Sequence, residues 1–293
     1  MIENYVVIIG AMKAGTTSLF QLLAQHPSIA PCQPKEPGFF AFEEIFDRGF
    51  CWYESLFAYE AGRHAFGLEA STDYSKYPYC KSVAERMEQS GRNFKLIYIM
   101  RHPLRRIESH ARHVQAARKE LGQIVSDKPD HSLDAGVSEL SLAASRYALQ
   151  LDQYQSFFER GDLLILSFEE MTAAPENIGR KVLDFLGLEA GGGPLTLEQH
   201  NAAKRIHRAG EPHKLWRAAQ AFAPLRWLVK LAAPAGLRRR WREKTRPAIQ
   251  IKGRFKLTAA EEEALLAALT PDLARLQNVY GFDVAGQWGL RVL

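Results

Sequence analysis

The sequence predicts an α/β fold in which a doubly wound parallel sheet is flanked by helices. Apolar runs at 6–9, 94–100 and 162–167 have the length and composition of short buried strands, and helical patterns alternate with them. Such alternation is typical of parallel strands that are covered on both faces. A hydrophobic content of 46% is ample for a packed core. We therefore expect a single domain over 1–293, with a variable basic insertion at about 190–250.

The first apolar run leads into a glycine-bracketed turn, GAMKAGTT, from Gly10 to Thr17. A strand, a tight turn and a helix N-terminus place several backbone N–H groups around one point, where the helix dipole favours an anion. The turn keeps the two glycines and the final hydroxyl of the P-loop pattern G-x-x-x-x-G-K-[ST], but Thr16 replaces its lysine. Lys13 supplies the cation from inside the turn instead. The stretch is therefore predicted to be a P-loop-like phosphate site.

The net charge of +5 comes from one segment. Eight Lys or Arg residues lie between Arg226 and Arg246 against Glu243 alone, so this segment carries +7 and the rest of the chain −2. Two interpretations stay open: a peripheral contact with an anionic membrane or an acidic partner, and a packed helix with a solvated basic end. We expect no nucleic-acid partner, and the sequence indicates no oligomeric state.

Cysteine usage and the N-terminus favour a cytoplasmic location. The three cysteines, Cys32, Cys51 and Cys80, form no C-x-x-C pair, so free thiols in a reducing compartment are expected. The chain enters its first strand without a signal-peptide pattern, and no apolar run reaches the ~18 residues of a membrane-spanning helix. His110 and His113 have helical spacing but no further ligand nearby, so no metal site is expected.

Several motifs together resemble one enzyme family. The order is G-x-x-K-x-G-T-T-S-L after a strand, then Lys35-Glu36-Pro37, then Arg101-His102-Pro103 after a strand, with Ser109 eight residues on. It resembles the sulfotransferases that use 3′-phosphoadenosine 5′-phosphosulfate (PAPS), in particular bacterial relatives of the carbohydrate and heparan type. The resemblance runs from Val6 to about Gly187 and resumes at 252–254. It implies transfer of the sulfuryl group of PAPS to an acceptor hydroxyl (EC 2.8.2.-), leaving 3′-phosphoadenosine 5′-phosphate (PAP), without a metal.

The resemblance also implies roles for the residues that hold the nucleotide. Lys13 would neutralise charge on the bridging oxygen as the S–O bond breaks. Arg101 and Ser109 would bind the 3′-phosphate, for which a bidentate guanidinium is well suited. We expect Arg105 and Arg106 on a solvated face. Further nucleotide contacts are implied for Ala14, Gly15, Thr16, Thr17 and Ser18 at the 5′-phosphosulfate, and for Lys252, Gly253 and Arg254 over the 3′-phosphate and adenine.

On the acceptor side, Glu36 is predicted to be the general base, because a neutral alcohol attacks sulfur poorly unless its proton is taken. The alternative is a solvated ion pair with Lys35. No histidine lies between His26 and His64 to take the role. Lys35, Asp73 and Tyr74 are candidate acceptor contacts, and the aromatic stretch 42–59 is either core or an acceptor wall.

The acceptor itself is left open as a hydroxyl-bearing small molecule, glycan or lipid. Ala70 stands where the family segment E-K-S-P-x-Y has a lysine, which weakens the expectation of a polyanionic sugar. The loop predicted at 115–138 could cover the acceptor. Segments 168–171 and 182–187 are expected to be scaffold.

Two other functions are considered. A P-loop kinase or nucleotidase predicts magnesium and an acidic residue after a core strand, where this chain has Arg101. A non-catalytic nucleotide-binding module would recognise an acidic lipid or partner through 226–246.

The last predictions concern helices. One helical pattern covers 140–159, and a second helix covers 258–269, with a capping box of Thr258 and Glu261. The tail, 272–288, is predicted to form a final helix and a strand-like end.

Overall fold

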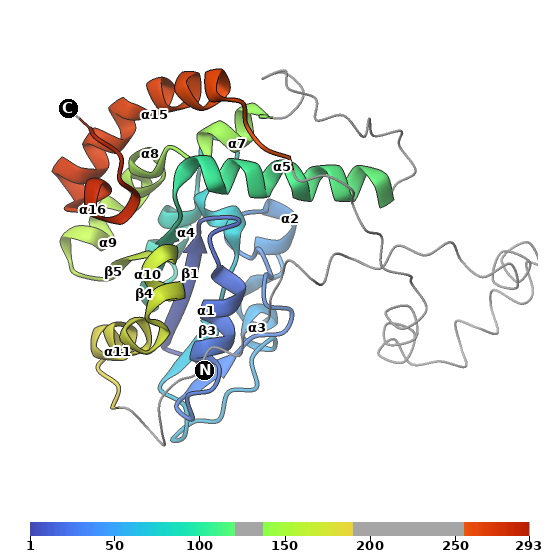
Figure 1. The fold of residues 1–293 in the computed structure, drawn as a ribbon. Coiled ribbons are helices and arrows are strands. Elements are labelled where there is room, and N and C mark those ends of the chain that lie inside the picture. The colour runs from blue at the N-terminus through green and yellow to red at the C-terminus, as the bar shows by residue number, and fades with distance from the viewer. Residues whose placement is uncertain (121–136, 190–254, 293) are drawn as a thin grey trace, which may run out of the picture. The chain divides into compact units, whose positions relative to one another are not determined.

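The computed structural model describes residues 1–120, 137–189 and 255–292, and the side chains of all of these except 116–120. Five parallel strands form one sheet in the order β2-β3-β1-β4-β5 (Figure 1). Their bounds are Asn4–Gly10 for β1, Ile29–Pro31 for β2, Phe66–Glu69 for β3, Asn93–Met100 for β4 and Leu163–Ser167 for β5. The sheet lies in one compact unit, whose described residues are 1–111, 137–189 and 256–292. The predicted α/β parallel sheet with flanking helices is confirmed.

One face of the sheet is covered by α1 (Thr16–Leu23), α10 (Phe168–Ala173) and α11 (Pro175–Leu186) (Figure 1). Alternate residues of β1 and β4, such as Val6, Ile8 and Ile97, are buried against leucines and valines of these helices. Because successive side chains of a strand point to opposite faces, the other residues of the same strands must be buried elsewhere.

The opposite face is aromatic. Tyr5 of β1 stacks on Phe94 of β4 with ring centroids 5.3 Å apart, and Phe39 stacks on Tyr53 at 4.5 Å. Phe39, Phe40 and Tyr53 are fully buried. Within the stretch 42–59, Tyr53 and Phe57 are buried in this core, whereas Phe42 is exposed, so the core interpretation holds for part of the stretch. Three short elements contribute aromatic rings to this cluster: α2 (Glu43–Phe46), α3 (Gly49–Glu54) and η1 (Thr72–Ser75). Helix α4 (Val83–Gln89) contacts it through Arg86, whose guanidinium lies over the ring of Phe46.

Two helix predictions are corrected by long-range contacts. The pattern over 140–159 predicts one helix, but the structure has α7 (Glu139–Ala143), α8 (Tyr147–Leu151), η2 (Asp152–Tyr154) and α9 (Gln155–Glu159). The carboxylate of Asp272 accepts hydrogen bonds from the N–H groups of Ala148 and Leu149, which begins a new helix inside the pattern.

The C-terminal helix α15 (Ala259–Tyr280) begins at the predicted capping box of Thr258 and Glu261. It then continues through Pro271, where the sequence predicts an end. Burial of Asp272, Leu273 and Leu276 explains the continuation, because packing against the rest of the unit outweighs the local cost of the proline. A short helix, α16 (Val284–Trp288), follows where a strand-like end is predicted.

The remaining long helix, α5 (Pro103–Glu120), extends beyond the predicted start of a loop at 115. None of the helices in the described ranges combines the length and apolar character that crossing a bilayer requires. All three cysteines are free thiols, as predicted.

Candidate active site

The parallel register brings the carboxyl ends of the strands to one edge of the sheet. Val7 of β1 is paired with Glu69 of β3, and Met100 of β4 with Ser167 of β5. Ligands of open α/β sheets bind at this edge. The predicted site residues come after strands that end at this edge. The glycine turn follows β1, Lys35 follows β2, Tyr74 follows β3 and Arg101 follows β4.

The glycine-bracketed turn joins β1 to α1. Gly15 has a φ of 90°, and a Cβ there would lie 2.6 Å from the ring of Phe168. The positive φ favours a residue without a Cβ and the close approach of Phe168 requires it, and glycine is the only such residue. No side chain caps α1, so the N–H groups of its first turn are left for another acceptor. Lys13 has a φ of 71°, which is uncommon for a residue with a side chain and recurs at functional sites.

Phe168 connects this turn to Arg101. The guanidinium carbon of Arg101 lies 4.7 Å from the centroid of the Phe168 ring, which also lies against the turn at Gly15 and packs on the core. The main-chain oxygen of Arg101 accepts a hydrogen bond of 2.6 Å from the hydroxyl of Tyr147. The sequence assigns Phe168 to scaffold alone, but the structure puts it in the wall of the site. Its position directly after β5 was the available signal.

Arg106 corrects a second prediction. Arg105 is exposed and pairs with Glu108 at 3.1 Å, but Arg106 is fully buried. The Nε of Arg106 donates to Ser145 Oγ at 2.8 Å, and its two Nη atoms donate to Ser141 and, at 3.5 Å, to the carbonyl of Met12. Burial lowers its pKa. The predicted solvated face is therefore wrong for Arg106, which holds positive charge directly behind the turn that carries Lys13.

The stretch Lys35 to Gly38 lies against the end of β3. Lys35 pairs with the carboxylate of Glu36 and donates through Nζ to the carbonyl of Ala70 at 3.2 Å. The hydroxyl of Thr72 donates to Glu36 Oε2 at 3.4 Å. The side chain of Glu36 is 40% exposed, so it is held by neighbours and still reaches solvent. The ion pair that the sequence offers as an alternative exists, and it leaves the carboxylate accessible.

The two remaining acceptor candidates, Asp73 and Tyr74, are each bonded to another side chain. Asp73 forms an ion pair with Lys76, three residues on. Tyr74 is only 2% exposed, and its hydroxyl donates to Glu69 Oε1 at 2.9 Å. Contact of either residue with an acceptor stays a prediction.

Glu69 is a residue that the sequence reasoning does not single out. It ends β3, is fully buried and accepts hydrogen bonds from Tyr53, Tyr74 and Ser71. Burial raises its pKa to about 7, against the lowering effect of these hydrogen bonds and of Lys35. A carboxylate at the end of an apolar strand was the signal for it.

The nucleotide side and the acceptor side are joined by contacts. A Cβ on Gly10 would overlap Ser75 of η1, the same short helix that contains Thr72. Thr72 in turn bonds Glu36. Ser109 lies on α5, about two turns after Arg101. Lys252, Gly253, Arg254 and the basic segment 226–246 lie outside the described residues.

The described part of the chain contains no group of three His, Cys, Asp or Glu side chains that could hold a metal ion. A glycine-bracketed turn between a strand and a helix at the carboxyl edge of a parallel sheet, with lysine and arginine beside it, is the arrangement in which nucleotide-binding α/β proteins hold phosphate. The sulfotransferase domain family matches residues 3–215. The chain belongs to this family.

Known relatives agree with this assignment. Heparan sulfate glucosamine 3-O-sulfotransferase 3B1 of Mus musculus is 26% identical over 230 residues, which cover 71% of this chain and 54% of that protein. Heparan sulfate glucosamine 3-O-sulfotransferase 6 of Homo sapiens is 27% identical over 186 residues, covering 62% and 52%. The chain thus spans about half the length of these curated relatives.

A solved sulfotransferase from Alicyclobacillus acidocaldarius has a similar fold. It superimposes with a TM-score of 0.53 and 25% identity, and the match covers 81% of this chain and 100% of that one. The fold and the family match identify a sulfotransferase domain, as the sequence motifs imply.

Proposed function

We propose that this protein transfers the sulfuryl group of PAPS to a hydroxyl of a glycan-type acceptor, with Lys13 and Glu36 as its catalytic residues. The supporting observation is the contact path along one sheet edge, which runs from the Lys13 turn through η1 to Glu36 and through Phe168 to Arg101. The turn proposed for the sulfuryl donor, the proposed base Glu36 and the proposed 3′-phosphate ligand Arg101 then lie along one edge of the sheet.

The donor would lie with its 5′-phosphosulfate on the turn. Backbone N–H groups from Ala14 to Ser18, with the hydroxyls of Thr16, Thr17 and Ser18, would hold the anionic oxygens. The cradle suits an anion, because no side chain caps the first turn of α1 and the buried Arg106 adds positive charge behind it. Arg101 and Ser109 would bind the 3′-phosphate, and Lys252, Gly253 and Arg254 would close over the nucleotide.

In the transfer step the acceptor oxygen forms a bond to sulfur while the bond from sulfur to the 5′-phosphate oxygen breaks. Glu36 takes the acceptor's proton, and the electron pair of the broken bond stays on PAP. Lys13 stabilises the negative charge that grows on the leaving oxygen. The pairing of Glu36 with Lys35 and Thr72 would hold the base in one orientation as it gains its proton.

The acceptor class rests on the relatives, whose names refer to heparan sulfate. Ala70, in place of a lysine, favours a glycan with fewer anionic groups, and small-molecule or lipid hydroxyls fit the same chemistry. Lys35, Asp73 and Tyr74 are proposed to line the acceptor side. Peripheral membrane contact through 226–246 and a cytoplasmic location stay predictions, which vesicle binding and cell fractionation would test.

The test is Glu36→Gln, with Glu44→Gln on the exposed surface of α2 as the matched control. We expect Glu36→Gln to keep its affinity for PAP, measured by calorimetry, and to lose about 10²- to 10⁴-fold in turnover of labelled PAPS. Glu44→Gln should match the parent in both. Unchanged turnover, or loss of PAP affinity instead of rate, would contradict the assignment of Glu36 as the base.

A further inference from the structure

We propose that Glu69 is a positioning residue for catalysis: its buried carboxylate orients two hydroxyls that hold the loop carrying Glu36. The inference rests on the proposed function, in which Glu36 is the base. Glu69 would not touch the substrate, because it is fully buried.

The direction of the hydrogen bonds carries the inference. Above its pKa of about 7 the Glu69 carboxylate is ionised and can only accept, so in that form the hydroxyls of Ser71 and Tyr74 donate to it, at 3.0 and 2.9 Å. Each hydroxyl has one proton, and that proton is then used. What each oxygen has left is acceptor capacity, and each one meets a backbone N–H.

Those N–H groups belong to the Glu36 loop. Gly38 N donates to Ser71 Oγ at 3.0 Å, and Phe40 N donates to the hydroxyl of Tyr74 at 3.2 Å. Both bonds are buried. A third bond, from Ala70 N to the carbonyl of Lys35, holds the other end of the loop at 3.1 Å. Glu36 therefore lies between two points that are attached to the strand end at Glu69.

Burying an isolated carboxylate is unfavourable, and the raised pKa of Glu69 reflects this. An amide in its place could donate as well as accept. It would then compete with Gly38 N and Phe40 N for the hydroxyl oxygens, and the loop would lose its single arrangement. Tyr53, which donates to Glu69 at 2.8 Å, holds the carboxylate from the core side. The network specifies one loop position at a cost in stability.

The experiment compares Glu69→Gln with Asp272→Asn in the whole chain. Asp272 is a matched control, because it is also a buried carboxylate with a raised pKa and accepts backbone N–H bonds, but at the start of α8. For Glu69→Gln we expect kcat to fall at least tenfold, the KM for PAPS and the Kd for PAP to stay within twofold, and the amide hydrogens of Gly38 and Phe40 to exchange at least tenfold faster. Asp272→Asn should lower Tm but leave kcat and those two exchange rates unchanged.

Native exchange rates at Gly38 and Phe40 in Glu69→Gln would overturn the proposal, as would equal losses of kcat in the two variants. If Glu69→Gln fails to fold, Ser71→Ala and Tyr74→Phe decide the question. Ser71→Ala should speed exchange at Gly38 alone, and Tyr74→Phe at Phe40 alone; no change in either contradicts the network. The exchange readout does not depend on Glu36, so an active Glu36→Gln would remove the base assignment without deciding the role of Glu69.

Discussion

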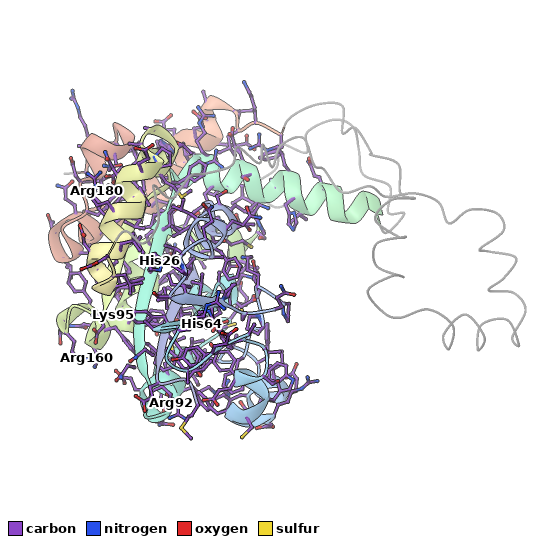
Figure 2. The ribbon with its side chains drawn as sticks, turned by 90° about the horizontal axis from the view of Figure 1, so that it is seen from below. His26, His64, Arg92, Lys95, Arg160 and Arg180 are labelled. Atoms are coloured by element: carbon purple, nitrogen blue, oxygen red, sulfur yellow. The ribbon has the colours of Figure 1, made fainter. Side chains whose placement is uncertain are left out.

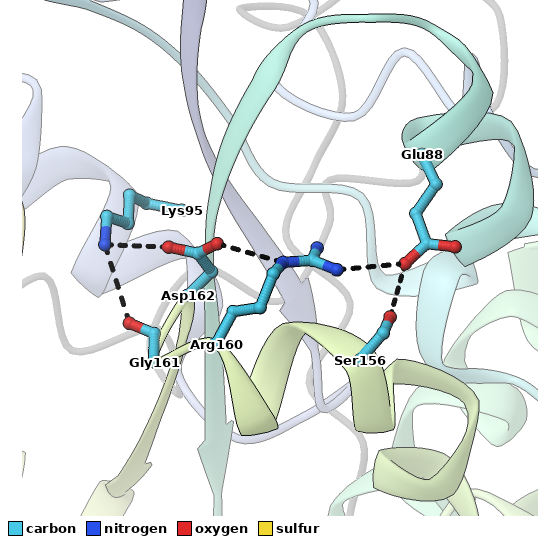
Figure 3. A network of polar contacts seen from close by, with 6 residues as sticks. All are labelled: Glu88, Lys95, Ser156, Arg160, Gly161 and Asp162. Atoms are coloured by element: carbon cyan, nitrogen blue, oxygen red, sulfur yellow. Dashed lines mark hydrogen bonds and ion pairs between the residues drawn. The ribbon is translucent and has the colours of Figure 1, made fainter.

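Charged side chains gather at both ends of the parallel sheet, but their partners differ. At the amino end, Lys95 pairs with Asp162 at 2.9 Å, and Arg160 bridges Asp162 and Glu88, each at 3.4 Å (Figure 3). These side chains are 28% to 50% exposed and line an open cleft of about 780 Å³. Figure 2 shows Arg92, Lys95 and Arg160 close to the start of β4. Each charged side chain in the network of Figure 3 therefore has an oppositely charged partner, and all of them are partly exposed to water.

At the carboxyl end, Glu69 and Arg106 are fully buried, and their hydrogen-bond partners are hydroxyls and carbonyls. Exposed pairs are screened by water and contribute little to stability. Buried charges with neutral partners are costly, but they keep a strong local field. The comparison teaches that the functional edge differs from the solvated one by its buried charges, Glu69 and Arg106, because both edges also carry partly exposed ion pairs.

The largest effect is expected from Lys13→Ala on the nucleotide turn. Removing a cation from the place where negative charge develops should lower turnover by about 10²- to 10³-fold or more. Circular dichroism should show an intact fold. Lys81→Ala, at an exposed position, is the control. Turnover at the parent rate would exclude Lys13 from the mechanism.

The pH dependence of stability should sharpen the contrast next. Because burial raises the pKa of Glu69 from 4.5 to about 7, the native state binds its proton more tightly than the unfolded state does. This stabilisation is fully present below pH ~4.5 and is lost as pH rises through ~7. Relative to Glu69→Gln, the parent should lose about 3 kcal/mol of unfolding free energy across that range. Urea denaturation of both proteins at pH 5 and pH 8 measures this change. If the difference in unfolding free energy between the parent and Glu69→Gln is the same at both pH values, Glu69 is not a buried, titrating group.

Arg101→Ala should have the third effect, confined to the extra phosphate of the ligand. We expect affinity for PAP to fall about 10- to 100-fold, as a charge-assisted contact implies. Affinity for AMP, which lacks the 3′-phosphate, should change little. Arg105→Ala, at an exposed position four residues further on, serves as the control. Calorimetry that finds equal weakening of both ligands would refute the assigned role.

The smallest effect is expected at the amino end. Arg160→Ala removes both ion pairs of an exposed guanidinium, so the unfolding free energy should change by less than about 1 kcal/mol, and turnover should be that of the parent. A larger loss, or a change in rate, would mean that this end is coupled to the site.

Much of the fold and part of the site could be predicted from local patterns. The strands at 6–9 and 94–100, the glycine turn with Lys13 and the capping box of Thr258 each depend on neighbours within a few residues. Arg106 and Phe168 could not be assigned in this way. Arg106 looks like its exposed neighbour Arg105 until Ser141 and Ser145 are brought against it from beyond residue 136.

The amino-acid sequence by itself determined the alternation of strands and helices, the glycine-bracketed turn and the family, because these follow from periodicity, glycine conformation and motif order. Only the tertiary structure decided that Glu69 and Arg106 are buried charges, that Phe168 lies between Gly15 and Arg101, and that α15 continues through Pro271. The physical reason is that burial is a property of contacts between distant segments, and no local pattern contains it.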